Sequence, residues 1–137
     1  MSKIFDKTTD TLAASTNLRL LRQNITSSNI ANAETPGYKA QKVDFEEALS
    51  RALDHEGLGK MHTSDDEHFL MGQGAIGRVR ADVYDNPEIN LTNDGNTVDL
   101  EKEMATLSEN TILYRAALQL INKKLGAMKY AATEGAR

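Results

Sequence analysis

The sequence predicts a mainly α-helical protein, with antiparallel N- and C-terminal heptad helices of the coiled-coil type around a small irregular and β-containing insert. Three observations support this: a weak heptad pattern at the start, a Pro-Gly turn after it and a strong heptad pattern at the end. The predicted organisation is a helix and turn over residues 1–40, an insert over 41–97 and a helix over 98–137. With 39% hydrophobic and 5% aromatic residues, we expect a thin core and a partly disordered monomer.

The N-terminal helix is predicted from a seven-residue repeat that contains both apolar and polar residues. Polar residues in a coiled-coil seam specify register more than they add stability. We therefore expect this helix to need a partner, which the C-terminal helix provides in the simplest arrangement. The repeat consists of Ile4, Thr11, Leu18, Ile25 and Asn32, with Ala14, Leu21 and Ser28 at the intermediate positions.

A compulsory turn follows the first helix. Pro36 cannot donate a backbone hydrogen bond and disfavours a helical Thr35, and Gly37 permits the positive φ of a type II turn. Small Ala31 and Ala33 allow a close approach of another helix. Asn29 and Asn32 are candidates to satisfy backbone groups at the helix end, and Tyr38 to place its hydroxyl on a polar partner across the turn.

The insert combines several short patterns. Asp44 and Glu47 form a capping pair for a short helix through Leu53, with Phe45, Ala48, Leu49 and Ala52 on one side. Residues 54–74 are polar and glycine-containing, which indicates a flexible loop. The alternation of residues 79–84 predicts a short strand that ends at Asn86-Pro87, and residues 93–96 predict a turn.

The C-terminal helix is predicted over residues 99–132, with Asp99 as its N-cap. Apolar residues recur at alternating spacings of four and three over more than four heptads, and further apolar residues beside them indicate more than one partner helix. The predicted packing seam contains Leu100, Met104, Leu107, Thr111, Tyr114, Leu118, Ile121, Leu125, Met128 and Ala132.

Composition excludes several classes of function. A net charge of -4 without a concentrated basic face argues against nucleic-acid binding. The sequence contains no cysteine, so it has neither a disulfide framework nor a thiolate metal site. No catalytic constellation or phosphate-binding loop is present, and we expect no cofactor, no metal and no small-molecule substrate. The first residues do not match a cleaved signal, and no stretch approaches membrane-spanning length.

Two oxygen- or nitrogen-rich patterns offer alternatives. Asn90, Thr92, Asp94, Gly95 and Glu101 reproduce the spacing of a calcium loop, so a calcium-responsive helical binding module is the alternative function. The first ligand is Asn and the preceding helix is missing, which disfavours it. The second pattern could be drawn as a metal cluster, but a solvated loop explains it better. It contains His55, His62, His68, Asp65 and Asp66.

The motif of residues 29–38 and the Val98-Asp99-Leu100 start of the last helix, with Glu103 and Met104, resemble the two ends of the flagellar rod and hook protein family. The small insert makes the chain most similar to the members of the proximal rod. The resemblance implies a structural subunit whose terminal helices pack into layers of a tube, the drive shaft for motility. It implies self-association in a helical array and contacts with other rod subunits, a rod-to-ring adaptor protein, the membrane-embedded ring and the export gate.

The resemblance also implies a location in the basal body, in the periplasm, after export through the flagellar type III apparatus without a cleaved signal. Phe45 and Leu49 have the spacing of a recognition motif for the export gate, although the same spacing arises on the buried face of a short helix. The residues of the turn motif become an assembly joint. They are Asn29, Ala31, Asn32, Thr35, Pro36, Gly37 and Tyr38.

Overall fold

The computed structural model describes residues 7–57, 76–86 and 94–134, and it confirms the mainly helical fold with a small β insert. Within these ranges, the chain begins and ends with a long helix. Between them in the sequence come two short strands, a short helix and a single 3-10 turn. The elements are α1 (Lys7–Ala31), β1 (Gln41–Asp44), α2 (Glu46–Gly57), η1 (Ile76–Arg78), β2 (Asp82–Asp85) and α3 (Leu100–Glu134).

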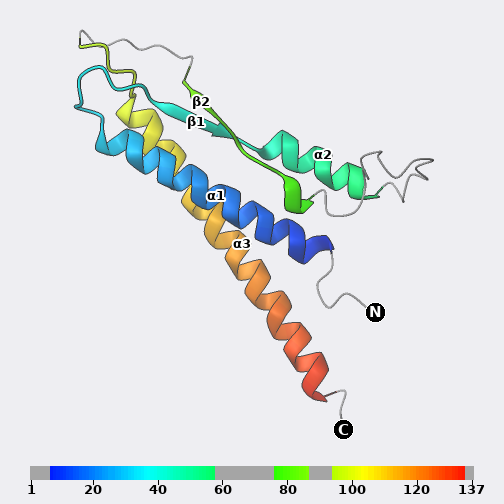
Figure 1. The fold of residues 1–137 in the computed structure, drawn as a ribbon. Helices are drawn as coiled ribbons and strands as arrows, with labels where there is room; N and C mark the ends of the chain where they lie inside the picture. The colour runs from blue at the N-terminus through cyan, green and yellow to red at the C-terminus, as the bar shows by residue number, and fades with distance from the viewer. Residues whose placement is uncertain (1–6, 58–75, 87–93, 135–137) are drawn as a thin grey trace, which may run out of the picture.

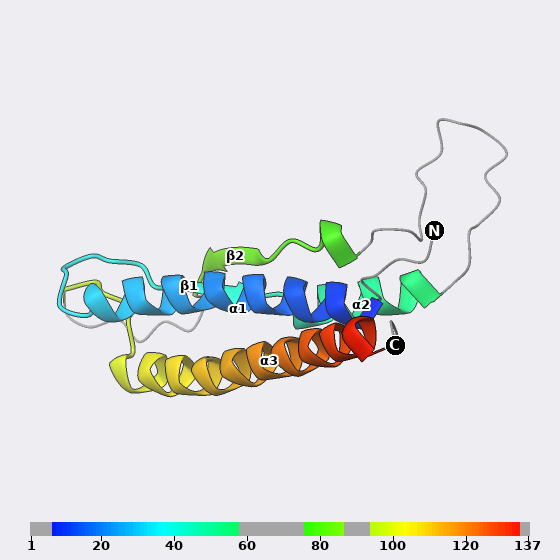
Figure 2. The same ribbon diagram turned by 90° about the horizontal axis from the view of Figure 1, so that it is seen from below.

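The two terminal helices run antiparallel, as predicted. Figures 1 and 2 show α1 and α3 side by side in opposite directions. In Figure 1 the C-terminal end of α3 moves away from the N-terminal end of α1. Asp99 is the N-cap of α3, because its Oδ1 accepts the Lys102 amide at 3.2 Å and its carbonyl accepts the Glu103 amide at 2.9 Å. The cap fixes where α3 begins, directly after the segment that returns to the end of α1.

The insert contains a two-stranded antiparallel sheet, of which only one strand was predicted. β1 pairs with β2 in the register Val43↔Val83, and β2 begins at Asp82. β1 replaces the predicted helix cap: Asp44 lies in this strand and its carboxylate accepts the Tyr84 hydroxyl, so the capping prediction for Asp44 is wrong. α2 begins at Glu46 and extends beyond the predicted end at Leu53.

The small hydrophobic core lies between α1 and the insert. Buried Leu18, Val43 and Phe45 form its centre, with Ile25 and Val79 packed against them. Leu18 and Ile25, which were predicted to pack between the terminal helices, also contact the insert in this core. Leu21, another residue of the N-terminal seam, is 38% exposed. The apolar residues of α1 are therefore divided between two neighbours. A helix that has a sheet on one side and another helix on a second side needs apolar residues on both.

The face of α3 that is buried in the chain is rotated from the predicted seam. Glu103, Asn110 and Ala117, seven residues apart, are buried, whereas Leu100 is 46% and Met104 55% exposed. Small and polar residues on this line leave the larger apolar side chains on the flanks of the helix. The predicted seam residues that remain half-buried are Leu107, Thr111, Tyr114, Leu118, Ile121 and Met128, and Leu125 is exposed.

Candidate functional site

The turn motif and the segment before α3 fold together into one unit, which we call the joint (residues 29–41 and 94–98). Gly37 has a φ of 73°, and the Tyr38 amide donates to the Thr35 carbonyl at 3.3 Å, as the predicted Pro-Gly turn requires. The Gly37 amide donates to the Asp94 carbonyl at 3.0 Å, and the Thr97 amide to the Tyr38 carbonyl at 3.1 Å. Main-chain bonds therefore tie the end of α1 to the start of α3.

Asn96 holds the turn that follows the C-terminal end of α1. Its side chain is 1% exposed, and its Nδ2 atom lies 2.9 Å from each of three carbonyl oxygens, those of Asn32, Ala33 and Thr35. Its Oδ1 atom accepts the Val98 amide at 2.8 Å. All three carbonyls follow Ala31, the last residue of α1, so one side chain from a distant part of the chain holds the turn that ends α1.

Asn29 holds the exit of the turn against α1. It is fully buried, its Nδ2 donates to the Gln41 carbonyl at 2.8 Å and its Oδ1 accepts the Gln41 amide at 3.1 Å. The Tyr38 hydroxyl donates to the same Oδ1 at 3.3 Å, so Tyr38 reaches a polar partner across the turn. Asn29 thus pairs with the main chain as a neighbouring strand would.

The other motif residues have local partners or face outward. The Asn32 side chain donates to the Ser28 carbonyl at 2.8 Å, and its Oδ1 accepts the Thr35 hydroxyl at 3.1 Å. Ala33 is half-buried, whereas Ala31 and Pro36 are exposed. Within a single chain, Ala31 therefore makes no close helix contact, and its small size leaves room for a neighbour.

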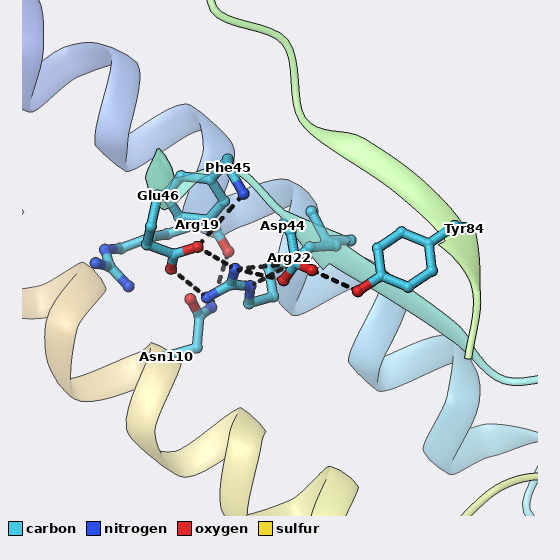
Figure 3. A network of polar contacts seen from close by, with 8 residues as sticks. Arg19, Arg22, Asp44, Phe45, Glu46, Tyr84 and Asn110 are labelled. Atoms are coloured by element: carbon cyan, nitrogen blue, oxygen red, sulfur yellow. Dashed lines mark hydrogen bonds and ion pairs between the residues drawn. The ribbon is translucent and has the colours of Figure 1, made fainter. Parts of the chain in front are cut away.

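Arg22 connects α1 to the strand that leaves the joint. Its Nε and Nη2 donate to the Val43 carbonyl at 3.0 and 2.7 Å, and its guanidinium pairs with both oxygens of Glu46 at 2.6 and 2.7 Å. It also lies 4.5 Å from the centre of the Phe45 ring, and Figure 3 shows it between Asp44 and Glu46. A planar guanidinium suits such a combination of a forked carboxylate pair and aromatic stacking.

The pKa values of two glutamates, Glu46 and Glu103, are shifted in opposite directions. Burial alone would raise the pKa of Glu46, but the Arg22 hydrogen bond and charge outweigh it, so the pKa lies below its ordinary value. Burial raises the pKa of Glu103, because the Asn29 hydrogen bond and the Lys42 charge only partly compensate, and Asp99 adds to the increase. Glu103 is therefore a carboxylate held at a free-energy cost where α3 meets the joint.

A second polar contact joins the two long helices. Asn110 of α3 is 2% exposed and donates to the Arg19 carbonyl of α1 at 2.8 Å. The Asn110 Oδ1 and an Arg19 Nη1 are buried without a hydrogen-bond partner. Buried polar positions of this kind fix the relative register of two helices at a cost in stability.

Phe45 lies directly before α2, and Leu49 lies in the first turn of this helix. Phe45 is 2% exposed and Leu49 is half-buried. Two guanidinium groups, those of Arg19 and Arg22, lie over the Phe45 ring. In the folded chain Phe45 belongs to the core, so recognition of this residue requires an unfolded chain.

The metal alternatives fall mostly outside the described residues. Asn90 and Thr92 of the calcium pattern, and His62, His68, Asp65 and Asp66 of the second pattern, lie outside them. In residues 7–57, 76–86 and 94–134, no group of three His, Asp or Glu side chains is placed to hold a metal ion. Gly95, at the glycine position of the calcium pattern, has a φ of 78° and packs against the Gly37 backbone in the joint.

Sequence reasoning missed Asn96, Arg22 and β1. Asn96 follows Gly95 and precedes the N-cap by three residues, which indicates a turn but does not show which helix its side chain reaches. Arg22 follows Leu18 by one helical turn, so a cation on an otherwise apolar face was the available signal. Among the helices that the structure describes, none is long and apolar enough to cross a membrane.

Comparison with known proteins gives consistent similarities. Residues 11–39 match the family model described as flagella basal body rod protein. The chain is 35% identical over 128 residues to the flagellar basal body rod protein FlgB of Aeromonas hydrophila, covering 93% of this chain and 94% of that protein. It is 40% identical over 111 residues to FlgB of Cereibacter sphaeroides, with coverage of 81% and 82%. It is 34% identical over 119 residues to FlgB of Salmonella typhimurium, with coverage of 82% and 83%.

Proposed function

Because the chain belongs to the FlgB family of flagellar basal body rod proteins, which are structural and not enzymatic, we propose that it polymerises through α1 and α3 in the proximal rod. The rod would act as a tubular drive shaft for motility. The observation that supports polymerisation is the apolar surface that α3 leaves exposed. It includes Leu100, Met104, Ile112, Leu113, Leu120, Leu125 and Tyr130, with exposed fractions between 40% and 68%.

An exposed apolar surface of this length on one helix is costly in water and is typical of an interaction surface. A tube needs contacts between different surfaces of successive subunits, since identical surfaces that face each other close a dimer and stop growth. Exposed side chains on more than one side of α3 meet this need. The joint would keep α1 and α3 at a constant angle, so that every subunit presents the same surfaces.

The proposed location is the basal body, on the periplasmic side, after export through the flagellar type III apparatus. The proposed partners are other rod subunits, the rod-to-ring adaptor protein, the membrane-embedded ring and the export gate, with self-association in a helical array. Recognition of Phe45 and Leu49 by the gate would take place before folding, because Phe45 is buried in the core and Leu49 is half-buried afterwards. Replacing both with Ala and measuring secretion tests this part, and unchanged secretion would contradict it.

The rod function is tested in cells. Deleting the gene should remove the rod and motility, and an epitope-tagged copy should restore both and appear in purified basal bodies. A Leu113→Gln and Leu120→Gln double variant should keep the helix content of the free chain but fail to restore motility, because these side chains are exposed before assembly. Ser108→Gln, on an exposed polar position of the same helix, is the matched control. Basal bodies without the tagged protein would refute the rod function.

A further inference from the structure

Two rows of mostly apolar residues flank the buried line of α3. Flank A contains Met104, Thr111, Leu118 and Leu125, spaced by seven, and flank B contains Leu113 and Leu120, also spaced by seven. At 3.6 residues per turn, the flanks lie roughly a quarter turn to either side of the line through Glu103 and Asn110, which faces α1.

Both flanks stay partly open within the described chain. On flank B, Leu113 and Leu120 are 40% and 54% exposed. On flank A, Met104 and Leu125 are 55% and 40% exposed, and Thr111 and Leu118 are half-buried. A helix with one buried line and two exposed flanks can contact α1 and two further helices at the same time. The equal spacing of the two rows means that one row can pack along the other without losing register.

We propose that flank A of one copy of the chain packs against flank B of the next copy, with the two α3 helices parallel and side by side. This inference rests on the proposed rod function and names its contact surfaces. The contact is heterologous, so that each copy keeps one flank free for a further copy and the array does not close.

The side chains select one register. A shift of five residues places Leu118 opposite Leu113 of the neighbouring copy and Leu125 opposite its Leu120. The same shift brings exposed Arg115, at the border of flank A, within one residue of the neighbour's exposed Glu109, at the border of flank B. A shift of two residues in the other direction pairs Leu118 with Leu120 and Thr111 with Leu113, which is one leucine pair instead of two, and it leaves Arg115 opposite an alanine. The chosen register displaces the helices by about 7.5 Å along their axes.

Disulfide cross-linking tests the contact, since the natural sequence contains no cysteine. In a variant with Leu113→Cys and Leu118→Cys, mild oxidation of purified basal bodies should join successive copies into a ladder of covalent multimers. The two cysteines of one helix point to different sides, too far apart for an internal bond. Each single-cysteine variant should stay monomeric, because flank A does not meet flank A.

A register control uses Leu118→Cys with Leu120→Cys. In the proposed register the latter lies about 10 Å along the axis from the former's partner position, beyond the reach of a disulfide, so the ladder should be at least about tenfold weaker. Equal ladders in both pairs, or dimers of a single-cysteine variant, would overturn the inference. Variant protein present in basal bodies without cross-links would overturn it too and leave the rod function intact. Absence of even the wild-type protein from basal bodies would overturn both.

Charge reversal gives a second test that does not depend on cysteine substitutions. Glu109→Arg and Arg115→Glu should each reduce motility, because each places like charges across the contact. The two changes together in one chain should restore it, since the pair is formed between copies. Circular dichroism of the free variants checks that the helices are kept. A double variant that moves no better than the single ones would contradict the flank-to-flank contact.

Discussion

The joint and α3 differ in how far a single chain satisfies their side chains. In the joint, the polar groups of the motif are satisfied by the chain itself: three carbonyls of the turn after α1 share Asn96, and Asn29 bonds both main-chain groups of Gln41. In α3, apolar side chains such as Ile112 and Leu120 remain 68% and 54% exposed. The first region is complete in one copy, whereas the second is completed by its neighbours in the proposed rod.

This difference separates two tasks of a subunit that has to be added many times. A joint that closes within the chain gives each copy the same angle between α1 and α3, at no cost to assembly. Apolar side chains that stay exposed on the flanks of the free chain can be buried between copies, and this burial supplies the driving force for the contact. Changes in the joint should therefore lower the stability of the free chain, and changes on the flanks should not.

The largest loss of stability is expected from Asn96→Ala. The change removes the side-chain donor that three carbonyls of the turn after α1 share, which leaves the Ala33 carbonyl without its donor, and it removes the acceptor of the Val98 amide. The free energy of unfolding should therefore fall by about 3 kcal/mol. Urea denaturation followed by circular dichroism measures it. Asn17→Ala, at an exposed position of α1, should change stability by less than about 0.5 kcal/mol. Equal effects of the two changes would show that the joint does not hold the chain together.

Arg22→Ala should have the next largest effect. It removes two hydrogen bonds to the Val43 carbonyl, the forked pair with Glu46 and the cover of the Phe45 ring, so we expect a loss of about 2 kcal/mol. The same denaturation experiment measures it, with exposed Arg51→Ala as the matched control. If Arg22→Ala behaved like the control, β1 would be held to α1 by the apolar core alone.

Gly37→Ala tests the turn through backbone strain alone. A side chain at this position would contact no atom within 4 Å, but φ is 73°, where an L-residue other than glycine loses about 1–2 kcal/mol. Gly77→Ala is the matched control, because it also has open space and lacks the positive φ. A loss of the same size at both glycines would mean that the turn conformation is not what makes Gly37 necessary.

The sequence was sufficient for the regular parts of the fold. The heptad spacing predicted α1 and α3, Asp99 predicted the start of α3, and Pro36 and Gly37 predicted the turn, because each depends on residues close in the chain. The family resemblance, carried by the motif and by the start of α3, was confirmed by the comparisons.

What failed depended on distant partners. The predicted seam identified α3 as a helix but did not identify its buried side. Leu100 and Met104 fit a heptad pattern as well as Glu103 and Asn110 do. Only the position of α1 decides which of these residues are buried. The carboxylate of Asp44 found Tyr84 instead of a helix end, since β2 lies beside it. No local pattern shows that Asn96 reaches carbonyls more than sixty residues earlier.

The smallest expected effect, and the one with the opposite sign, is at Glu103, where the joint meets α3. Burial raises the pKa of Glu103, so the folded chain binds its proton more tightly than the unfolded chain does. The free energy of unfolding contributed by this group therefore falls as pH rises from the ordinary range of a glutamate through the raised value, and it stays low at neutral pH. Glu103→Gln should remove this loss and should still accept the Asn29 hydrogen bond.

Urea denaturation of the wild type and of Glu103→Gln across this pH range measures the effect. Near pH 4 the two should be equally stable, and at pH 7 the variant should be more stable by up to about 1 kcal/mol. Glu101→Gln, at an exposed position two residues earlier, is the matched control variant. A variant that is less stable at pH 7 would mean that the Glu103 charge holds Asn29 and Lys42 in place. The carboxylate would then support the joint instead of weakening the contact between α1 and α3.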